Sequence, residues 1–592
     1  MSYIYTGNSR SFLRISFNLR ATLFILKISM AEKKEIVNLL DEIADFLEFH
    51  SENPFKISAF RNGSNTIRKL NDDINELVNS GELKKVKGIG KGIYAVIEEY
   101  CSHGFSTALD ELKKDIPDSL AELFQIRGLG PKKISLLFNQ EKIKSIDDLK
   151  TACNENKLLS VKGFGEKIQQ KILEEIGQIE ENRNYLLIHF AERESGKIKI
   201  LFDELPVIKK YEFTGEIRRT KEVYSSLEVV ILVESDKVDE LLSSFKEKIT
   251  LDVISGEILK SNTAVKLPLT IYLVHSENDF TARLFETTGS EEFLTKLGYA
   301  SNKFRSDNEE EIFSKMNAQY TAPEMREKDF FSISNKELQI PSYLTNEQLK
   351  GFLHFHTTYS DGLNSVEEMV SSAIKLGYDY FAVCDHSKTA AYANGLSEHR
   401  ILKQRGEIVD INSRTRWRLL QGIESDILTN GELDYPEEVL QEFQFVVASV
   451  HSNFSLSEEE MTRRIVKAIE NPFTDVLGHP TGRLLLHRAP YKHNIKKIID
   501  ACSRNQVALE INAHPNRLDL DWRNIFYARE QGCLFSINAD AHSLDNILLT
   551  KYGVAIARKG GIQTKEVINC FDYKTFVKFL NRKVTRKVER YE

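Results

Sequence analysis

The strongest constraint in this sequence is a series of seven short apolar runs that begins at residue 351. The runs cover residues 351–356, 380–384, 419–423, 445–450, 475–478, 507–511 and 534–537. Their length and apolar character are typical of buried β-strands, and helical patterns separate most of them. Because strands that alternate with helices form parallel sheets, the C-terminal part of the chain is predicted to be an α/β barrel.

A histidine, aspartate or glutamate follows every run except the sixth, which offers Glu510 and Asn512. Barrels of this kind carry their functional groups at the carboxyl ends of the strands, and residues two apart on a strand point the same way. A single buried histidine is more often a hydrogen-bonded core residue, but burying many ionisable groups together without a cation costs too much. The predicted metal ligands are His354, His356, Asp361, His386, Glu424, His451, His479, Asp540 and His542.

The first third of the chain carries an internal repeat. The pattern of residues 32–177 is helical, and one phrase with two glycines occurs at residues 86–91, 126–131 and 161–166. Two glycines in a turn between helices let backbone amides approach a phosphate, and nearby lysines add positive charge. We predict sequence-independent DNA binding, with a purely structural helical array as the alternative. The residues concerned are Gly88, Gly90, Lys91, Gly128, Gly130, Lys132, Gly163, Gly165 and Lys167.

Charge and cysteine content exclude several classes of protein. The formal net charge of −7 argues against a chain that coats nucleic acid through bulk positive charge. Six cysteines without a close pair suit a reducing compartment and exclude a thiolate zinc site, so we expect a cytoplasmic protein. The apolar stretch 21–28 is too short to span a bilayer, so no membrane partner is expected. Residues 1–29 are expected to be a disordered extension or the result of a start codon assigned too early, with Met30 as the true start.

The middle of the chain, together with the segments before it, resembles a known protein family. Residues 194–300 have the pattern of mixed strands and helices, with an apolar strand at 227–233 and period-two alternation at 267–274. The telling segments are Glu52-Asn-Pro-Phe-Lys56, Ala59-Phe-Arg61, the three glycine turns, Gly215-Glu-Ile-Arg-Arg219, Glu222 and Thr288-Gly-Ser290. Their order resembles that of the bacterial family X DNA polymerases, and the likeness covers nearly the whole chain after residue 30.

The polymerase chemistry of that family needs three carboxylates around two divalent ions. Where the family has an Asp-x-Asp pair, this chain has Ser226-Leu-Glu228, and at the third aspartate it has Thr270 or Ile271. We therefore predict a degenerate polymerase site at Ser226, Glu228 and Ile271. The middle region is expected to be a palm-like remnant that holds DNA or supports the structure.

Two other positions depart from the resemblance. Glu216 follows Gly215 where the family has a glycine-serine pair that receives the triphosphate. Two like charges about 4 Å apart repel by roughly 4 kcal/mol at an effective dielectric constant of about 20. Val96 stands at the position that resembles the family's Schiff-base lysine, so lyase activity is not expected either.

The C-terminal motifs resemble the polymerase and histidinol phosphatase domain, called PHP. The motifs are His354-x-His356, Ser360-Asp-Gly362, Asp385-His386, Gly422-Ile-Glu424, Val450-His-Ser452, Gly478-His-Pro480 and Asp540-Ala-His542. The resemblance implies a distorted (β/α)7 barrel with three divalent metal ions. One would be held by His354, His356, Glu424 and Asp540, a second by Glu424, His451 and His479, and a third by Asp361, His386 and His542. Mixed imidazole and carboxylate ligands suit manganese, zinc or iron.

Such a site predicts phosphoester hydrolysis, because bridged metal ions activate water and hold phosphate oxygens without a nucleophilic side chain. Glu424, His451 and Asp540 are therefore expected to be catalytic through the metals. Arg483 and Arg517 are candidate phosphate clamps, with an ordinary surface ion pair as the alternative for each.

The chain is thus predicted to be multidomain, with an all-α helix-hairpin-helix region, an α+β palm remnant and an α/β barrel. The expected divisions are residues 1–29 (extension), 30–110 (helical, first hairpin), 111–180 (helical, second and third hairpins), 181–322 (palm and thumb), 323–350 (linker) and 351–592 (barrel).

A phosphoesterase joined to three hairpins is expected to act on DNA. The resemblance implies a manganese-dependent 3′-to-5′ exonuclease, or another 3′-end-processing enzyme of DNA repair, that acts on gapped, nicked or 3′ ends. Three alternatives stay open: a small-molecule phosphatase of the histidinol-phosphatase type, a still-active repair polymerase, and a scaffold that docks repair partners on DNA ends. The sequence identifies no protein partner.

Overall fold

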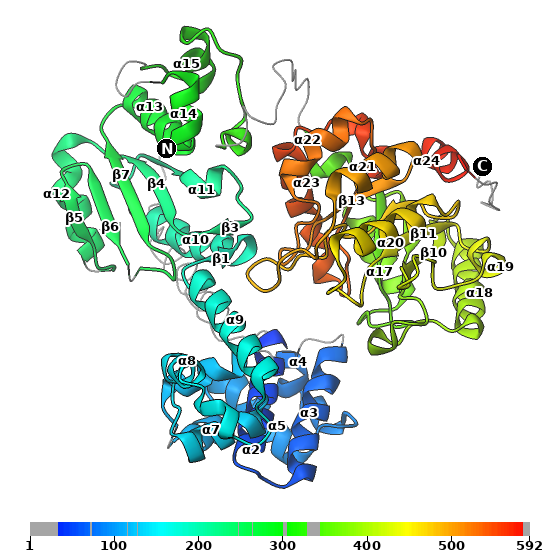
Figure 1. Cartoon of the computed structure of the whole chain (residues 1–592). Coiled ribbons are helices and arrows are strands. Elements are labelled where there is room, and N and C mark those ends of the chain that lie inside the picture. The colour runs from blue at the N-terminus through cyan, green and yellow to red at the C-terminus, as the bar shows by residue number, and fades with distance from the viewer. Residues whose placement is uncertain are drawn as a thin grey trace, which may run out of the picture. The chain divides into compact units, whose positions relative to one another are not determined.

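The computed structural model describes residues 33–70, 74–114, 116–126, 128–246, 248–262, 264–299, 305–327 and 344–583. The chain forms two compact units, Met1–Glu181 and Asn182–Glu592 (Figure 1). The extension expected at residues 1–29 and most of the linker expected at 323–350 lie outside the described residues. Over the described ranges, no helix combines the length and apolar character that a membrane crossing requires.

Over its described residues, the first unit is helical, as predicted. Its elements are α2 (Lys33–Phe49), α3 (Pro54–Lys69), α4 (Ile74–Asn79), η1 (Glu82–Lys85), α5 (Lys91–His103), α6 (Thr107–Lys113), η2 (Asp118–Gln125), α7 (Pro131–Glu141), α8 (Ile146–Asn154), η3 (Lys157–Ser160) and α9 (Glu166–Asn182). Apolar residues spaced at helical intervals bury one face of α2, including Ile36, Leu40, Ile43 and Leu47. Two separate hydrophobic cores result, one around α2 to α5 and one around η2 to α9.

The middle segment of the second unit is a mixed sheet with helices. Its strands are β1 (Leu186–Leu187), β2 (Lys210–Thr214), β3 (Val223–Tyr224), β4 (Leu227–Leu232), β5 (Asp252–Ser255), β6 (Ile258–Ser261) and β7 (Leu269–Val274). Its helices are α10 (Ile188–Asp203), α11 (Gly215–Arg218), η4 (Ser235–Lys237), α12 (Val238–Lys246), α13 (Glu277–Thr288), α14 (Glu291–Leu297), α15 (Glu309–Lys315) and η5 (Pro323–Met325). The main sheet has the order β2-β4-β7-β6-β5, and only β4 and β7 are parallel in it.

The C-terminal segment is a nearly closed barrel of seven parallel strands. The strands are β8 (Gly351–Phe355), β9 (Tyr380–Val383), β10 (Arg418–Asp426), β11 (Phe445–Ser449), β12 (Val476–Leu477), β13 (Ala508–Asn512) and β14 (Phe535–Asn538). They pair in sequence order from β8 to β14. A parallel bridge between Phe355 and Ala541 links the first strand to the segment after the last. The predicted fold class is confirmed.

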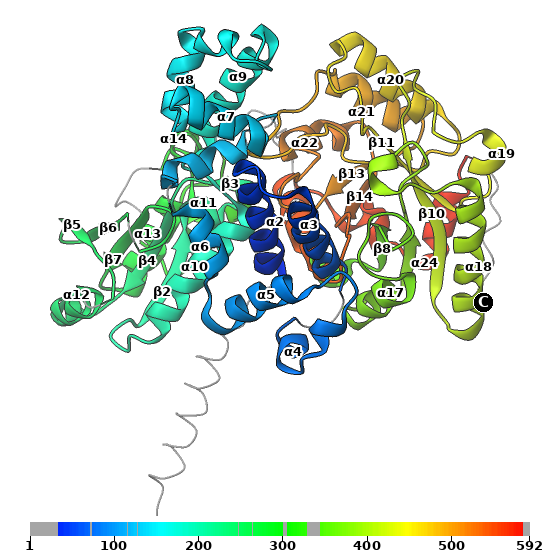
Figure 2. The same cartoon turned by 90° about the horizontal axis from the view of Figure 1, so that it is seen from below.

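Helices surround the barrel, among them α18 and α20 on the outer side of the strands (Figure 2). They are α17 (Val366–Lys375), α18 (Glu398–Arg414), α19 (Glu437–Leu440), α20 (Glu458–Glu470), α21 (Ile495–Arg504), α22 (Trp522–Glu530), α23 (Thr550–Lys559) and α24 (Tyr573–Leu580), with short turns η6 (Asn346–Gln348), η7 (Ala391–Ala393), η8 (Asp545–Leu549), η9 (Thr564–Glu566) and η10 (Ile568–Cys570). Phe576 of α24 packs its ring 4.7 Å from that of Tyr380 and 6.0 Å from that of Phe445. Since both partners begin a strand, α24 covers the amino end of the barrel.

Candidate metal centre

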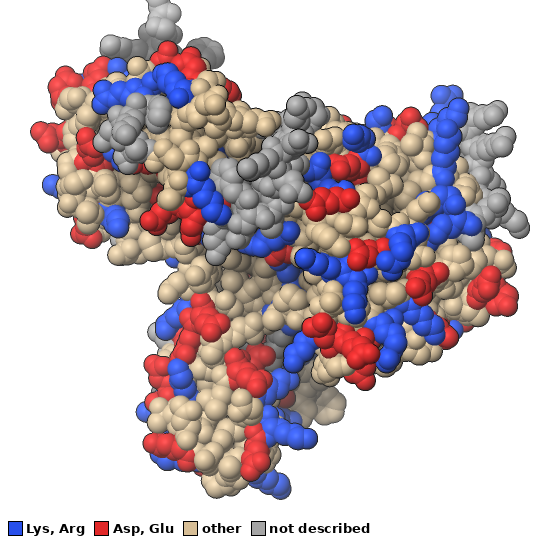
Figure 3. All heavy atoms as spheres, turned by 45° about the horizontal axis from the view of Figure 1, so that its top comes forward, with Lys and Arg blue, Asp and Glu red and all other residues tan. Residues whose placement is uncertain are grey.

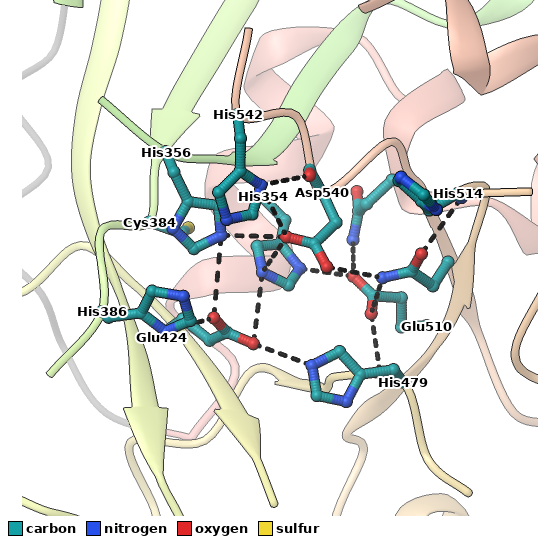
Figure 4. Close-up of polar contacts among 12 residues, drawn as sticks. His354, His356, Cys384, His386, Glu424, His479, Glu510, His514, Asp540 and His542 are labelled. Atoms are coloured by element: carbon teal, nitrogen blue, oxygen red, sulfur yellow. Dashed lines mark hydrogen bonds and ion pairs between the residues drawn. The ribbon is translucent and has the colours of Figure 1, made fainter. Parts of the chain in front are cut away.

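The carboxyl ends of the barrel strands bring ionisable side chains together in one cluster (Figure 4). Three overlapping groups have ligand atoms within 4.8 Å of one another: His356, Asp361, His386 and His542; His354, His356 and Asp540; His386, Glu424 and His451. The ring of His479 joins them, because its Nε2 lies 3.0 Å from Glu424 Oε1. All nine side chains singled out in the sequence therefore lie in this cluster.

Glu424 occupies the centre of the cluster and is almost fully buried. Its Oε1 lies 3.3 Å from His451 Nε2, and its Oε2 lies 2.9 Å from His386 Nδ1. Burial opposes its negative charge, but the surrounding histidines hold its pKa well below the usual range. A carboxylate with imidazoles on both oxygens is placed to bridge two cations. The three ligand sets expected from the resemblance are not sharply separated, since His356 and His386 each belong to two groups.

The backbone is unusual at three of the nine positions. His354, His479 and Asp540 have positive φ values of 53°, 24° and 51°. Such conformations cost free energy in residues other than glycine and gather at functional sites. The pairing of β8 with β9 also shifts its register between Leu353 and Phe355. Regular alternation, which the sequence prediction assumed, is therefore not what aims His354 and His356 at the cluster; a local irregularity of β8 contributes.

A second layer of side chains orients the candidate ligands. Glu510 accepts a hydrogen bond from His354 Nδ1 at 2.5 Å and from the backbone N–H of His479 at 2.6 Å. Asp426 accepts one from His451 Nδ1 at 2.6 Å. The contacts to His354 and His451 leave the opposite ring nitrogen of each available to the cluster, as the outer partners of metal-binding histidines do.

Two of these outer residues refine the sequence analysis. Glu510, the only acid offered by the sixth strand, supports ligands from outside the cluster. Asp426 was missed, although it lies two residues after Glu424 on β10, and period-two spacing was the available signal. Asp385, paired with His386 in its motif, instead accepts hydrogen bonds from Thr357 and Ser360 and so holds the loop that carries Asp361.

The buried polar atoms of the cluster fit divalent cations. Nε2 of His354, Nδ1 of His356 and Oε2 of Glu424 are buried and make no hydrogen bond with any described residue. Leaving such atoms without a partner is costly, and a cation removes that cost. Burial opposes a charge on His451, yet Glu424 and Asp426 raise its pKa to about 10. A proton is thus favoured where a cation would bind, so metal and protons compete for the site.

The two arginines proposed as phosphate clamps differ in the structure. Arg483 is buried, and its guanidinium donates to the carbonyls of Arg517 and Leu518 and, at 2.6 Å, to Asp521. It therefore braces the loop at residues 517–521, and its ion pair with Asp521 is partly buried. Arg517 lies at the cluster, with its Nε 3.8 Å from Asp540 Oδ2, and its side chain is 21% exposed.

The three glycine turns of the first unit share one geometry. The first glycine of each has a positive φ, 101° at Gly88, 83° at Gly128 and 93° at Gly163, which favours glycine. The apolar residue that follows is buried in every copy. The element before each turn is a 3-10 helix, and the element after it is an α-helix.

The second glycines of the turns are not required by the fold. Gly90, Gly130 and Gly165 lie outside the positive-φ region, and a Cβ at any of them would meet no atom within 4 Å. Each precedes a helix whose first backbone amides are available to an anion. The neighbouring Lys91, Lys132 and Lys167 are exposed. Glycine at these positions therefore leaves room for the close approach of a ligand. Acidic and basic side chains are otherwise interspersed over the face shown in Figure 3.

The acidic side chains near the edge of the middle sheet accept hydrogen bonds from neighbouring protein groups. Glu216 accepts from the backbone N–H of Ser225 at 2.6 Å and of Ser226 at 3.3 Å. Glu228 accepts from the Tyr272 hydroxyl at 2.7 Å, and burial raises its pKa above the usual range. Over the ranges that the structure describes, every group of three or more side chains able to share a cation belongs to the barrel.

One of the positions assigned to the degenerate site needs correction. Thr270 pairs with Glu228 across β4 and β7, whereas Ile271 pairs with Val229 and is fully buried in the core. Because neighbouring positions on a strand face opposite sides, Thr270, and not Ile271, lies beside Glu228.

Family comparisons agree with this anatomy. Residues 31–105 match a helix-hairpin-helix domain, residues 120–178 match a SAM-like helix-hairpin-helix tandem, and residues 353–514 match the PHP domain. A protein of Bacillus subtilis (strain 168) named "DNA polymerase/3'-5' exonuclease PolX" is 33% identical over 580 residues, which cover 93% of this chain and 99% of the relative. The chain belongs to the PolX family.

Other relatives of this PolX-family chain match only part of it. A protein named "Probable phosphatase" from Thermoanaerobacter sp. (strain X514) is 27% identical over 230 residues, or 36% of this chain and 88% of the relative. One of the same name from Acetivibrio thermocellus is 30% identical over 168 residues, or 27% of this chain and 64% of the relative. The family resemblance seen in the sequence is confirmed.

Proposed function

We propose that this chain is a manganese-dependent 3′-to-5′ exonuclease, or a related 3′-end-processing enzyme, that acts in DNA repair. The observation that carries the proposal is the cluster of nine candidate ligands at the barrel mouth, with buried imidazole and carboxylate atoms that make no hydrogen bond within the described part of the chain. The PolX relative named for its exonuclease activity supports DNA as the substrate.

In this proposal, the nine side chains hold up to three divalent ions, of which manganese, zinc and iron suit the ligands. Such ions supply Lewis-acid stabilisation of a phosphate and make water more acidic. Glu424, His451 and Asp540 orient the reaction by holding the cations, and Asp426 and Glu510 fix the histidines. Of the two candidate phosphate clamps, Arg517 is the better placed, because its guanidinium lies beside Asp540.

The hairpins would hold gapped, nicked or 3′-ended DNA through its backbone. Such contacts position a duplex without reading its sequence. The lysines beside Gly90, Gly130 and Gly165 supply the charge that this requires, although the whole chain carries a net charge of −7. A cytoplasmic location suits this role and the six unpaired cysteines.

We further propose that polymerisation has been lost in the middle segment. Glu216 places a carboxylate on the amides of Ser225 and Ser226, so negative charge already occupies that turn. Beside Glu228, β7 offers Thr270 in place of a second acid. A site with one buried, hydrogen-bonded carboxylate has too few ligands for two metal ions.

The test incubates the purified full chain with manganese and an end-labelled gapped duplex. Progressive loss of nucleotides from the 3′ end is expected, and His451→Ala should abolish it. His399→Ala is the matched control, because His399 is an exposed histidine of the same barrel outside the cluster. If the wild type leaves DNA intact, or if His451→Ala shortens it as fast as His399→Ala does, the proposed function is wrong.

A phosphatase acting on small monoesters is the second candidate, supported by the partial relatives named as probable phosphatases. The triple variant Lys91→Ala, Lys132→Ala, Lys167→Ala separates the two. An exonuclease should lose activity on DNA in this variant, whereas a monoester phosphatase should be unaffected and should turn over small monoesters faster than DNA. Primer extension upon addition of deoxynucleotides would contradict the loss of polymerisation.

A further inference from the structure

An exposed tyrosine stands at the mouth of the metal cluster. Tyr392 is 70% exposed, although its ring centroid lies 6.0 Å from that of His386 and 6.4 Å from that of His451. The planes are inclined by 59° and 72°, so neither imidazole lies flat on the tyrosine. Its hydroxyl makes no hydrogen bond with any described residue. The fold therefore gains little from this ring, which presents an open aromatic surface beside two candidate ligands.

The loop that carries Tyr392 is anchored to the cluster itself. Thr389 Oγ1 donates to Asp426 Oδ2 at 3.0 Å, and Asp426 also orients His451. Asn394 Nδ2 donates at 3.3 Å to the carbonyl of Ser360, the residue before Asp361. One end of the loop is thus tied to the support of one candidate ligand and the other end to the neighbour of another.

Backbone contacts close the loop on itself. Ser387 and Leu396 form a parallel bridge, and Gly395 lies so close to the Ser387 carbonyl that a Cβ would be 1.9 Å from that oxygen. Arg400 Nη1 donates to the Asn394 carbonyl at 2.7 Å. The position of the loop that carries Tyr392 relative to the candidate ligands is therefore set before any substrate binds, which reduces the entropy cost of using the ring.

We propose that Tyr392 is the platform on which the base of the 3′-terminal nucleotide stacks during hydrolysis. This inference rests on the proposed function. A phosphate at the cluster is joined to its base only through one sugar, so the base falls near a ring that contacts two ligands. An aromatic face binds any base, because every base has a π-face, and this suits an enzyme that removes nucleotides without reading them.

The reaction itself is unchanged by this contact. A water oxygen bonds to phosphorus, the bond from phosphorus to the 3′-oxygen of the preceding nucleotide breaks, and that oxygen gains a proton. The terminal nucleotide leaves with its phosphate. Tyr392 donates nothing to these steps and acts only by holding the base, so its removal should weaken binding more than it slows turnover.

The experiment compares two labelled single strands that differ only at the 3′ end, one ending in thymidine and one in an abasic tetrahydrofuran nucleotide. Wild type, Tyr392→Ala, Tyr392→Phe and the control Leu402→Ala are assayed with manganese. Leu402 is a 62% exposed apolar residue on α18. Tyr392→Ala should lower kcat/KM on the thymidine end about tenfold, within the range expected for one stacked base, mainly through KM. On the abasic end its kcat/KM should match that of the wild type.

Tyr392→Phe should keep wild-type rates on both ends, because it keeps the ring. Equal losses on both ends in Tyr392→Ala, no loss on either, or a Tyr392→Phe variant as slow as Tyr392→Ala would each overturn the stacking role. These outcomes differ from failure of the proposed function, in which the wild type itself would release no nucleotide from either strand.

Discussion

The barrel and the middle segment of the second unit both place acidic side chains near the end of a sheet, but these acids differ in how their hydrogen bonds are satisfied. In the barrel, the nitrogen and carboxylate oxygen atoms of Glu424 and the surrounding histidines face one another. Several of these buried atoms make no hydrogen bond with any described residue. In the middle sheet, Glu216 is satisfied by backbone amides and Glu228 by a tyrosine hydroxyl. Glu309 is satisfied likewise, by Arg218 at 2.7 Å and Arg326 at 2.8 Å.

The difference shows how a binding site can be told from a structural network of the same residue types. A site suited to a cation leaves buried ligand atoms without hydrogen bonds, whereas a structural network closes its own hydrogen bonds. By this criterion the barrel cluster is suited to hold a cation, and the described acids of the middle segment are not.

The largest effect is expected from His451→Ala. Removing an imidazole that contacts Glu424 should lower kcat for phosphoester hydrolysis by about 10³-fold, the upper range for loss of a preorganised electrostatic group. Initial rates of 3′-end shortening at saturating manganese measure it. Glu228→Gln in the middle sheet is the counterpart and should leave these rates unchanged; a loss in both variants would remove the contrast between the two regions.

Glu309 in the middle segment should make the free energy of unfolding decrease as the pH falls. Burial opposes its charge, but Arg218 and Arg326 lower its pKa from 4.5 to about 2. A carboxylate with a depressed folded-state pKa stabilises the protein above its unfolded pKa, and that contribution is lost as pH falls from about 5 to about 2. At neutral pH it is worth about 3 kcal/mol.

Glu309→Gln should therefore lower the free energy of unfolding by about that amount at pH 7 and by little near pH 2. Urea unfolding of both proteins across this pH range checks the prediction. A destabilisation that did not change with pH would mean that the carboxylate charge of Glu309 contributes nothing.

Glu216→Ala should have a smaller effect, on stability alone. It leaves the partly buried amides of Ser225 and Ser226 without their acceptor, which costs about 1–3 kcal/mol. Denaturant unfolding measures the loss, and nuclease rates should remain those of the wild type. A variant that instead gained deoxynucleotide binding and primer extension would show that the middle sheet is an inhibited polymerase.

The smallest effect concerns the hairpins. A methyl group at Gly90 would obstruct a phosphate without disturbing the fold, so Gly90→Ala should weaken DNA binding by about 1 kcal/mol, the value of one hydrogen bond. Gly92→Ala is the matched control, since a Cβ there also meets open space but lies inside α5. Equilibrium binding of a gapped duplex compares them, and equal affinities would favour the purely structural reading of the turns.

Much of the barrel could be predicted from sequence because residue types that bind metal follow most of the apolar runs that form its strands. All seven strands appear close to their expected positions, although β12 keeps only Val476–Leu477 and β10 extends to Asp426. The candidate ligands converge because topology alone brings the carboxyl ends of parallel strands together.

Backbone angles, strand register and side-chain direction could not be predicted from the sequence, for physical reasons. The positive φ of His354 and the register shift of β8 leave no trace in a hydrophobic pattern. Arg483 follows a ligand in sequence, yet its guanidinium turns toward Asp521, and only tertiary packing decides that choice. Ile271 and Thr270 could not be separated without the register between β4 and β7.

The central claim is that the barrel cluster holds divalent cations that the chemistry requires. Elemental analysis of the purified full chain, before and after a chelator, tests it most directly when joined to the nuclease assay. We predict bound manganese, zinc or iron, loss of 3′-end shortening when the metal is stripped, and recovery when manganese returns. Metal-free protein that shortens DNA as fast as the untreated protein would contradict the account.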